Sequence, residues 1–167
     1  MMKHLDNSGM VSDDMQWMNV ALEQAELAVV DGEVPIGAVI IKDGAIVSTG
    51  RNRREVEKSA LAHAEIEAIG EACKSLKSWR LSGCTLYVTL EPCPMCAGAI
   101  INARLDRVVF GAFDPKAGVA GSVIDLFACR FNHHPSVVGG VMKEECGALL
   151  QDFFRHLREL RRYKKLK

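Results

Sequence analysis

The sequence predicts an α/β fold: three layers, αβα, around a central mixed sheet of five strands. Segments with helical periodicity alternate with short apolar runs in the order α-β-β-α-β-α-β-(α)-β-α, which is typical of a sheet with helices on both faces. The first two apolar runs are joined by a Lys-Asp-Gly turn, which predicts a hairpin. At 167 residues, 49% of them hydrophobic and 25% charged, the chain matches one ordinary globular domain.

The first half of the chain predicts a helix, a hairpin and a loop. Residues 15–30 have helical periodicity, and the following Asp-Gly pair ends the helix. The residues expected on its apolar face are Met15, Met18, Leu22, Ala25 and Val29. Strands are expected at residues 34–41 and 45–49. Residues 50–60 are polar and basic, and we expect a loop there.

The second half alternates strands with helices. A helix is expected at residues 62–76 and a strand at residues 85–90. Another helix follows from Pro94, a residue that suits the first turn of a helix. Strands at residues 107–111 and 137–141 complete the predicted sheet.

A long connection and a long helix end the chain. Residues 112–135 are expected to form a long connection, with a short helix at residues 122–127. Long connections in compact domains are often functional. The last helix is expected at residues 143–163. Its predicted buried stripe is Cys146, Leu149, Leu150, Phe153, Leu157 and Leu160.

The N-terminal residues and the cysteines bear on the compartment. Residues 1–14 are polar and lack the apolar core of a signal peptide, so we expect a flexible tail and no export. The domain is then a single unit at residues 15–167. No apolar run approaches the ~20 residues that span a bilayer. The six cysteines are interpreted as metal ligands and buried apolar residues of a reduced, cytoplasmic protein.

The charge is distributed unevenly, although the net charge is zero. Residues 155–167 contain seven basic residues and one acid, Glu159, for a charge of +6, so the rest of the chain carries −6. The basic residues are Arg155, Arg158, Arg161, Arg162, Lys164, Lys165 and Lys167. Two interpretations remain open: a site for a polyanionic partner, or a solvated helix end that aids solubility.

Two short strings carry the chemistry. His63 and Glu65 form His-x-Glu, and Cys93 and Cys96 follow a proline as Pro-Cys-x-x-Cys. One imidazole and two thiolates are three zinc ligands, and they leave a fourth position for water, whose pKa zinc lowers toward neutrality. A carboxylate is better suited to moving protons than to a thiolate-rich metal site. The combined string is the signature of zinc-dependent base deaminases.

A structural zinc site is the alternative. Cys73, Cys84 or Cys129 would then supply a fourth ligand and close the site. Helical spacing raises a second question, which is whether His63 and Glu65 can reach the same site. Side chains two residues apart on a helix point ~200° apart. His63 and Glu65 therefore converge only if the helix start is suitably oriented. A second metal at His133, His134 and Cys129 is disfavoured, because that spacing fits no standard ligand set.

These strings resemble the cytidine deaminase superfamily. Within it, the chain resembles the bacterial tRNA-specific adenosine deaminases, which convert adenosine to inosine at the wobble position of an anticodon. The similarity runs from about residue 15 to residue 158 and includes residues 33–39 (EVPIGAV), 62–65 (AHAE), 85–99 (TLYVTLEPCPMCAGA), 108–112 (VVFGA), 120–122 (AGS), 131–133 (FNH) and 152–155 (DFFR). The resemblance implies a cytidine deaminase-like fold, one zinc ion per chain, a homodimer and a tRNA anticodon stem-loop as substrate.

The resemblance also implies the chemical roles of the motif residues. His63, Cys93 and Cys96 hold zinc, and Glu65 is the catalytic proton shuttle between the attacking water and the departing amino group. Asn52 would read the flipped base, although an asparagine there also suits a loop turn.

Further residues are expected to bind substrate. Val34 and Pro35 would wall the base pocket, or simply pack at a strand entry. Asp114 would lie near the flanking nucleotides, or serve as a turn aspartate before a proline. Phe154 would stack on a splayed base, as single-stranded RNA often allows, while Phe153 packs in the core. A helix–core role for both phenylalanines is the alternative.

Two departures from the family pattern touch the substrate mouth. Many relatives have Asp-Pro-Thr where this chain has Ser59-Ala60-Leu61, and residues 122–132 are about one residue shorter. Deamination of a free base or nucleoside, such as guanine or cytosine, therefore stays open beside tRNA deamination. The basic, aromatic C-terminal helix favours tRNA. A non-catalytic, zinc-stabilised RNA-binding module is disfavoured, because it would have no use for Glu65.

Overall fold

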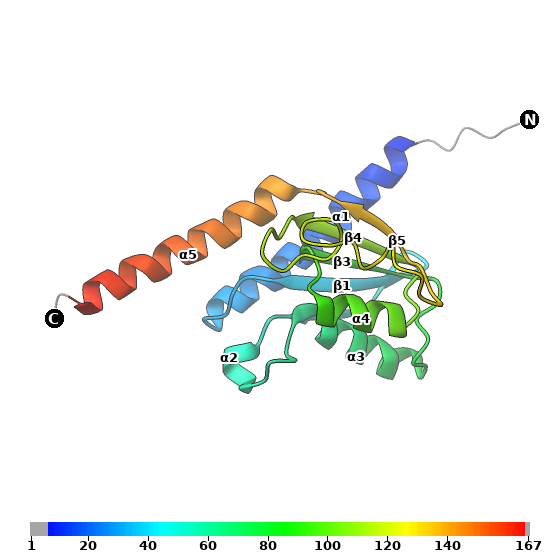
Figure 1. The fold of residues 1–167 in the computed structure, drawn as a ribbon, viewed down its shortest axis with the longest axis horizontal. Helices are drawn as coiled ribbons and strands as arrows, with labels where there is room; N and C mark the ends of the chain where they lie inside the picture. The colour runs from blue at the N-terminus through cyan, green and yellow to red at the C-terminus, as the bar shows by residue number, and fades with distance from the viewer. Residues whose placement is uncertain (1–6, 166–167) are drawn as a thin grey trace, which may run out of the picture.

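The computed structural model describes the backbone of residues 7–165 and the side-chain environment of residues 13–164. Helices and strands alternate along the chain much as expected (Figure 1). Their bounds are α1 (Asn7–Val30), β1 (Gly37–Lys42), β2 (Ala45–Arg51), α2 (Arg54–Glu57), α3 (Ala64–Leu76), β3 (Cys84–Leu90), α4 (Pro94–Asn102), β4 (Arg107–Ala112), β5 (Ser136–Gly139) and α5 (Lys143–Lys165).

Within the described residues, the five strands form one mixed sheet in the order β2-β1-β3-β4-β5. β1 is antiparallel to β2 and β3, whereas β4 is parallel to β3 and β5. Asp43 and Gly44 link β1 to β2 with positive φ angles of 50° and 73°, as a two-residue hairpin turn requires. The predicted mixed sheet and its hairpin are confirmed.

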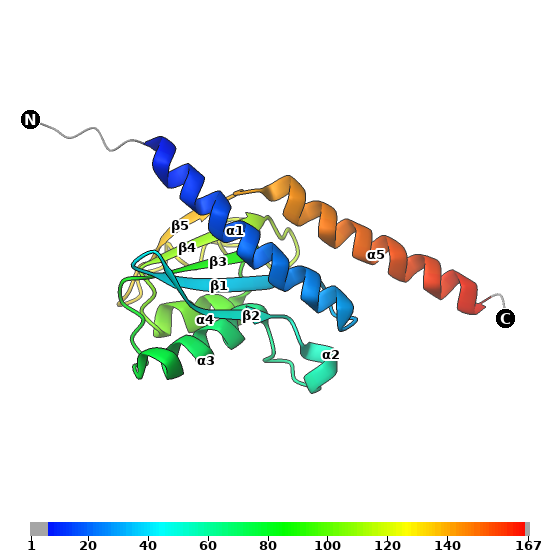
Figure 2. The same ribbon diagram turned by 180° about the vertical axis from the view of Figure 1, so that it is seen from behind.

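Helices cover both faces of the sheet, so the predicted αβα layering is also confirmed. α3 and α4 lie on one face, and α1 with the first turns of α5 lies on the other (Figures 1 and 2). Ala38 and Ile40 of β1 belong to the buried cluster beneath α3 and α4. Val39 belongs to the opposite cluster with Met18 of α1. This alternation follows from the two-residue period of a strand.

The first helix is longer than expected. α1 begins at Asn7, not at residue 15, and only residues 1–6 of the expected tail lie outside the described residues. Asp14 is buried and pairs with Arg107 of β4, with Nη1–Oδ1 and Nη2–Oδ2 distances of 2.7 Å. Tyr87 donates a further hydrogen bond to Asp14 at 2.9 Å. The polar stretch therefore contains an anchor for the helix on the sheet.

The buried face of α1 also differs from the expected one. The helix residues with no exposed surface are Met18, Ala21, Ala25 and Ala28. Met15 and Val29, both expected on the apolar face, are exposed. Small residues are needed on this face because the sheet comes close: a Cβ on Gly37 of β1 would lie 2.0 Å from the carbonyl oxygen of Ala21.

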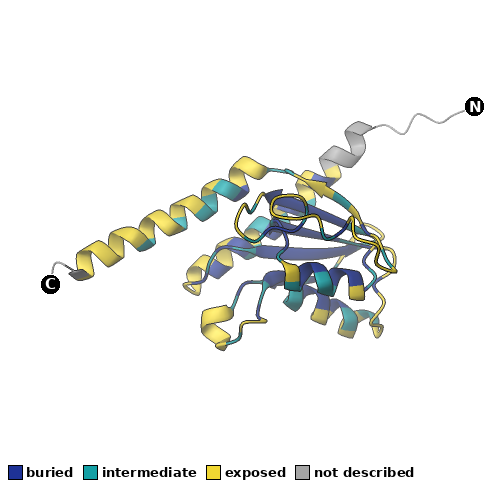
Figure 3. Cartoon of the chain, in the orientation of Figure 1, coloured by how far each residue is buried: buried dark blue, intermediate teal, exposed yellow. Residues whose placement is uncertain are grey.

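The predicted buried stripe of the last helix is largely wrong. Of its six residues, Cys146 alone is buried, and Leu160 is 45% exposed. α5 leaves the body of the protein after its first turns, and most of its surface is exposed (Figure 3). Phe153 is half-buried and belongs to neither buried cluster, so its assignment to the core is wrong.

The connecting segments differ from the expectations in two places. The expected loop at residues 50–60 contains the short helix α2. The expected short helix at residues 122–127 is absent from the structure, in which turns and an isolated bridge between Ala120 and Asp125 occupy this stretch. No helix in the described part of the chain is long and apolar enough to cross a membrane.

Candidate metal centre and substrate groove

His63 and Glu65 lie at the start of α3 and reach the same cluster. The sequence predicted that His63 lies in the first turn of this helix. The helix instead begins at Ala64, and His63 lies immediately before it, with an extended backbone at φ −88° and ψ 151°. The ~200° separation of helical residues two apart therefore does not apply to this pair. The extended backbone of His63 thus removes the objection, based on helical spacing, that the side chains of His63 and Glu65 point apart.

The start of α3 is held close to the sheet by a glycine of β2. A Cβ on Gly50 would lie 2.2 Å from the carbonyl oxygen of Ala64 and 2.7 Å from the backbone nitrogen of Ala68. Real Cβ atoms do not approach backbone this closely, so only glycine allows α3 to pack here. This packing determines where His63, one residue before the helix, is placed.

Cys93 and Cys96 lie at the start of α4. Cys93 precedes the helix with an extended backbone, Pro94 is the first helical residue, and Cys96 is fully buried. Helix N-termini favour thiolates, because the unpaired N–H groups and the helix dipole stabilise negative charge. The predicted position of both thiols at a helix N-terminus is confirmed.

The imidazole and the two thiols form one cluster. His63 Nδ1 lies 3.7 Å from Cys93 Sγ and 3.5 Å from Cys96 Sγ, and the three donor atoms all lie within 4.8 Å of one another. Zinc–sulfur bonds of ~2.3 Å and zinc–nitrogen bonds of ~2.05 Å at tetrahedral angles place such atoms about 3.6 Å apart. The cluster therefore has the dimensions of a tetrahedral zinc site.

The two thiols of the cluster differ in their pKa values. Hydrogen bonds with the Cys96 thiol and with His63 lower the pKa of Cys93 to about 4. The hydrogen bond with Cys93, together with burial, raises the pKa of Cys96. A bound divalent metal would favour the thiolate form of both side chains.

Glu65 lies beside the cluster without being one of its donors. Its side chain is 4% exposed, and burial raises its pKa to about 7. The neighbouring Cys96 thiol acts in the opposite direction and lowers the pKa of this carboxyl group. A carboxyl group in this position can take up or release a proton next to a metal, as general acid–base catalysis requires.

A closed, four-ligand site is not supported. Among the described residues, the cluster of possible ligands contains His63, Cys93 and Cys96 and no fourth member. The thiol of Cys73 faces the carbonyl of Trp79 instead. The second metal site is not supported either, because His133 Nε2 lies 2.6 Å from the carbonyl oxygen of Leu105 and no second cluster occurs among these residues.

Asn52 and Val34 are joined by a hydrogen bond. The Asn52 side chain is buried, and its Nδ2 donates a 3.2 Å hydrogen bond to the carbonyl oxygen of Val34. Its Oδ1 is buried and has no partner in the described part of the structure. Pro35 is buried and Val34 is half-buried. A buried amide oxygen without a partner is costly, so a ligand that donates a hydrogen bond there is stabilised.

A groove brings three of the predicted substrate residues together. Val34, Asp114 and Phe154 line a pocket of about 490 Å³, although they come from three distant parts of the chain. Asp114 also has the predicted turn role, because its Oδ1 accepts hydrogen bonds from the backbone N–H groups of Lys116 and Ala117. Phe154 is 43% exposed, so its ring is available to a ligand.

The same groove continues along α5 and becomes basic. A second pocket of about 500 Å³ shares Phe154 and Lys116 with the first and extends to Arg155 and Arg158. We call the two together the α5 groove. The hollow between α1 and α5 is different, since Glu23, Glu26, Glu145 and Asp152 are among its lining residues. Positive charge is therefore concentrated on the groove that also holds Val34.

Glu91 is a site residue that sequence reasoning missed. It is 2% exposed, and its carboxylate accepts hydrogen bonds from backbone N–H groups of residues 113–122. Burial by itself raises the pKa of this carboxyl group, but the hydrogen bonds from Ser122, Asp114 and Ala120 hold it below its usual range. Its position directly before the Pro-Cys string was the one available signal.

Proteins similar to this chain include deaminases that act on nucleobases. The sequence profile of the MafB19-like deaminase family matches residues 12–158, which is most of the chain. A tRNA-specific adenosine deaminase from Bacillus subtilis (strain 168) is 53% identical over 150 residues, covering 89% of this chain and 93% of the relative. The chain therefore belongs to the MafB19-like deaminases and, within them, to the tRNA-specific adenosine deaminases.

Solved structures agree with this assignment. A structure from a study of A-to-I editing by tRNA:A34 deaminases at the wobble position of transfer RNA matches with a TM-score of 0.78 and 43% identity. The match covers 81% of this chain and 99% of that one. The X-ray structure of guanine deaminase from Bacillus subtilis matches with a TM-score of 0.58 and 42% identity, over 67% of this chain and 71% of that one.

Proposed function

We propose that this enzyme deaminates adenosine to inosine at the wobble position of a tRNA anticodon, by zinc-dependent hydrolysis. The observation that carries the proposal is the cluster of His63, Cys93 and Cys96 with the buried carboxyl group of Glu65 beside it. The tRNA-specific relatives support the choice of substrate.

The reaction exchanges the C6 amino group of adenine for an oxygen atom from water and releases ammonia. Zinc, held by the three donors, would supply Lewis acidity and lower the pKa of water toward neutrality. Glu65 accepts protons from the attacking water and delivers them to the ring nitrogen and to the amino group. The C6–O bond forms and the C6–N bond breaks, so that the two water protons end on N1 and in ammonia.

Base recognition is assigned to Asn52 and the residues around it. The free Oδ1 of Asn52 accepts a hydrogen bond from the flipped base, and Val34 and Pro35 shape the wall of its pocket. A buried amide gives specificity, because an ill-matched base leaves it without a partner.

The α5 groove is assigned to the rest of the anticodon stem-loop. Phe154 offers an aromatic face for an unstacked neighbouring base, and Asp114, which lines the same pocket, would lie near the flanking nucleotides. Arg155 and Arg158 neutralise phosphates farther along the helix. We also propose one zinc ion per chain, a homodimer and action in the cytoplasm, as the family resemblance implies.

Incubation with total tRNA, followed by nucleoside analysis, tests the proposal. We expect inosine to form in tRNA and ammonia to be released in equal amounts. A parallel incubation with free guanine, cytosine and adenosine is the control for a small-molecule enzyme. Xanthine formed from guanine, with no inosine formed in tRNA, would contradict the proposal.

Guanine deamination is the second candidate, and one observation favours it. The Bacillus subtilis guanine deaminase shares 42% identity with 67% of this chain. The basic α5 groove favours tRNA over it, because a free base offers no phosphates. The non-catalytic zinc module is not supported, since the chain belongs to a family of enzymes.

A further inference from the structure

Glu91, which directly follows β3, accepts several hydrogen bonds from the segment 113–122. Its Oε1 accepts hydrogen bonds from the N–H groups of Ala120 at 2.8 Å and Ser122 at 3.1 Å. Its Oε2 accepts one from the N–H of Asp114 at 2.9 Å and another from the Ser122 hydroxyl. One buried carboxylate therefore joins both ends of the segment 113–122.

The segment is built to fit this carboxylate. A Cβ on Gly118 would lie 2.3 Å from Cδ of Glu91 and 2.4 Å from its Oε2. Glycine is thus the residue that lets the segment close around the side chain. A further hydrogen bond, from the N–H of Val119 to the carbonyl oxygen of Pro92, ties the segment to the turn that leads into Cys93.

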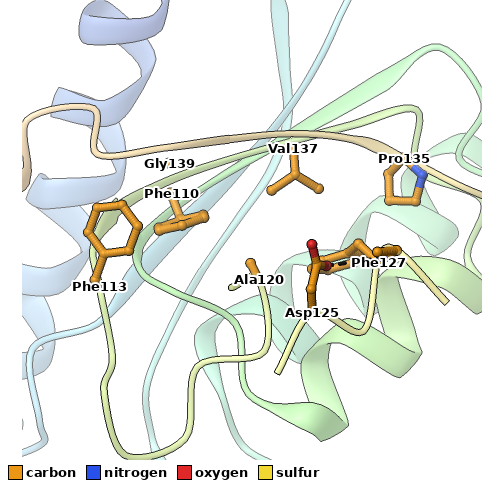
Figure 4. A pocket seen from close by; sticks show the side chains of 9 residues that line it. Phe110, Phe113, Ala120, Asp125, Phe127, Pro135, Val137 and Gly139 are labelled. Atoms are coloured by element: carbon orange, nitrogen blue, oxygen red, sulfur yellow. Dashed lines mark hydrogen bonds between the residues drawn. The ribbon is translucent and has the colours of Figure 1, made fainter. Parts of the chain in front are cut away.

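Packing against the sheet holds this region only in part. Val119 and Phe127 are buried, but a pocket of about 380 Å³ separates the stretch around Ala120 and Asp125 from Val137 of β5 (Figure 4). The hydrogen bonds to Glu91 are therefore a main anchor where side-chain packing is incomplete.

The anchored segment carries one wall of the α5 groove. Phe113 and Asp114 line the groove together with Phe154, and Leu90, the neighbour of Glu91, lines it as well. Phe113 also packs edge to face on Phe110 of β4, with ring centroids 5.1 Å apart. The position of Asp114 in the groove follows from its own N–H bond to Glu91.

We propose that Glu91 is a positioning residue for substrate binding: its carboxylate holds residues 113–122 in the conformation that forms the wall of the α5 groove. It acts through Asp114 and Phe113 and touches neither the reacting base nor the metal donors. The inference rests on the proposed function, because it takes the groove as the site of the anticodon stem-loop.

Glu91→Gln tests the inference with little change of shape. The glutamine keeps one acceptor oxygen but turns an NH₂ group toward backbone N–H donors, so the segment loses its anchor. Asp106→Asn is the matched control, because Asp106 accepts a 2.8 Å bond from the Gly83 N–H at the opposite end of β3 and β4. Inosine formation is measured under single-turnover conditions on an anticodon stem-loop, with zinc content measured beside it.

We expect the half-saturating enzyme concentration to rise about tenfold for Glu91→Gln, because the groove wall must then be ordered on binding. The maximal rate should fall by less than about threefold, with zinc content unchanged. Asp106→Asn should match the wild type. Unchanged half-saturation in a folded Glu91→Gln variant would overturn the inference, as would a loss of zinc with the maximal rate alone reduced.

Two milder variants keep the test decisive if Glu91→Gln does not fold. Ser122→Ala removes one of the four hydrogen bonds, and Gly118→Ala pushes the segment away from the carboxylate. Both should raise half-saturation in the same direction, and wild-type values in both would overturn the inference. A wild-type enzyme that forms no inosine in the stem-loop instead overturns the proposed function, and with it this inference.

Discussion

The metal cluster and the α5 groove are built in opposite ways. The cluster is assembled from two helix N-termini packed on the sheet, with Cys96 fully buried and Glu65 almost so. The groove is open, and its two arginines, Arg155 and Arg158, belong to the part of α5 that leaves the body of the protein (Figures 1 and 3).

The difference suits the role that we propose for each region. Metal donors and a proton shuttle must be held within a fraction of an ångström, which only dense packing achieves. A polyanion is attracted by charges that stay hydrated and act over several ångströms, so exposure is no disadvantage. Substitutions in the cluster should therefore remove activity, whereas substitutions in the groove should weaken binding.

The largest effect is expected at the metal donors. Cys96→Ser should remove the metal and bring deamination below detection, because a buried hydroxyl is a far weaker zinc ligand than a thiolate. Metal content is measured by atomic absorption on the purified protein. Cys129→Ser, at an exposed cysteine, is the control and should keep the metal. Stoichiometric zinc in Cys96→Ser would refute the ligand assignment.

The next effect is expected at Glu65. Glu65→Gln should keep the metal and the fold while the rate of inosine formation falls about 10³-fold, since the amide cannot carry a proton. Single-turnover kinetics together with metal analysis separate the two roles. Glu71→Gln, at an exposed glutamate of α3, should behave as the wild type. A Glu65→Gln variant with a normal rate would remove the proton-shuttle role.

A smaller effect is expected in the groove. Arg155→Ala combined with Arg158→Ala should raise the dissociation constant of an anticodon stem-loop about tenfold at 0.15 M salt, because two phosphate contacts are lost. The slope of log affinity against log salt should become shallower by about 1.4. Binding is measured by fluorescence anisotropy at several salt concentrations.

The control for the groove removes two positive charges elsewhere. Lys74 and Arg80 lie at and beyond the last turn of α3, and both are exposed. Lys74→Ala combined with Arg80→Ala should leave the dissociation constant and its salt slope unchanged. Equal weakening by the two double variants would show that net charge, and not the groove, governs binding.

Asp14 lies in neither region and should affect stability alone. Asp14→Asn should lower the free energy of unfolding by about 2 kcal/mol, because Arg107 and Tyr87 lose a charged hydrogen-bond partner. Urea unfolding measures the loss, and Asp13→Asn, at an exposed neighbour, is the control. The kinetics of inosine formation should not change; a changed maximal rate would show that α1 also supports the cluster.

The contribution of Asp14 should depend on pH. Burial opposes ionisation, but the hydrogen bonds from Arg107 and Tyr87 lower the pKa of Asp14 below its usual value. In the unfolded chain the carboxyl group therefore protonates first as the pH falls. The stabilisation is fully present above the unfolded pKa, near 4, and is lost as the pH falls through the folded pKa. The stability difference between wild type and Asp14→Asn should shrink over that range.

Local patterns predicted the parts of the fold that local interactions build. The positive φ angles at Asp43 and Gly44 follow from the residue types of a two-residue turn. The position of Cys93 just before a helix follows from Pro94 as its first residue. These features involve neighbours in the chain, so the sequence carried enough information for them.

Patterns failed where distant contacts decide burial. The apolar stripe of α5 has the period of a buried helix, yet within the described residues it is only half-buried or exposed beyond Cys146. Asp14 looked like part of a polar tail, because its partner Arg107 is far away in the chain. Phe153 was assigned to the core for the same reason as the stripe. Periodicity shows which residues share a face, but not what that face meets.

The sequence by itself identified the candidate metal donors, the carboxyl group proposed to carry protons and the alternation of helices and strands, because residue types and short spacings encode them. Tertiary structure alone decided that His63 meets two thiols 30 and 33 residues away, and that Glu91 anchors a segment as far away as Ser122. Such contacts depend on the order and direction of the strands, which bring the ends of strands that are distant in the sequence to one edge of the sheet.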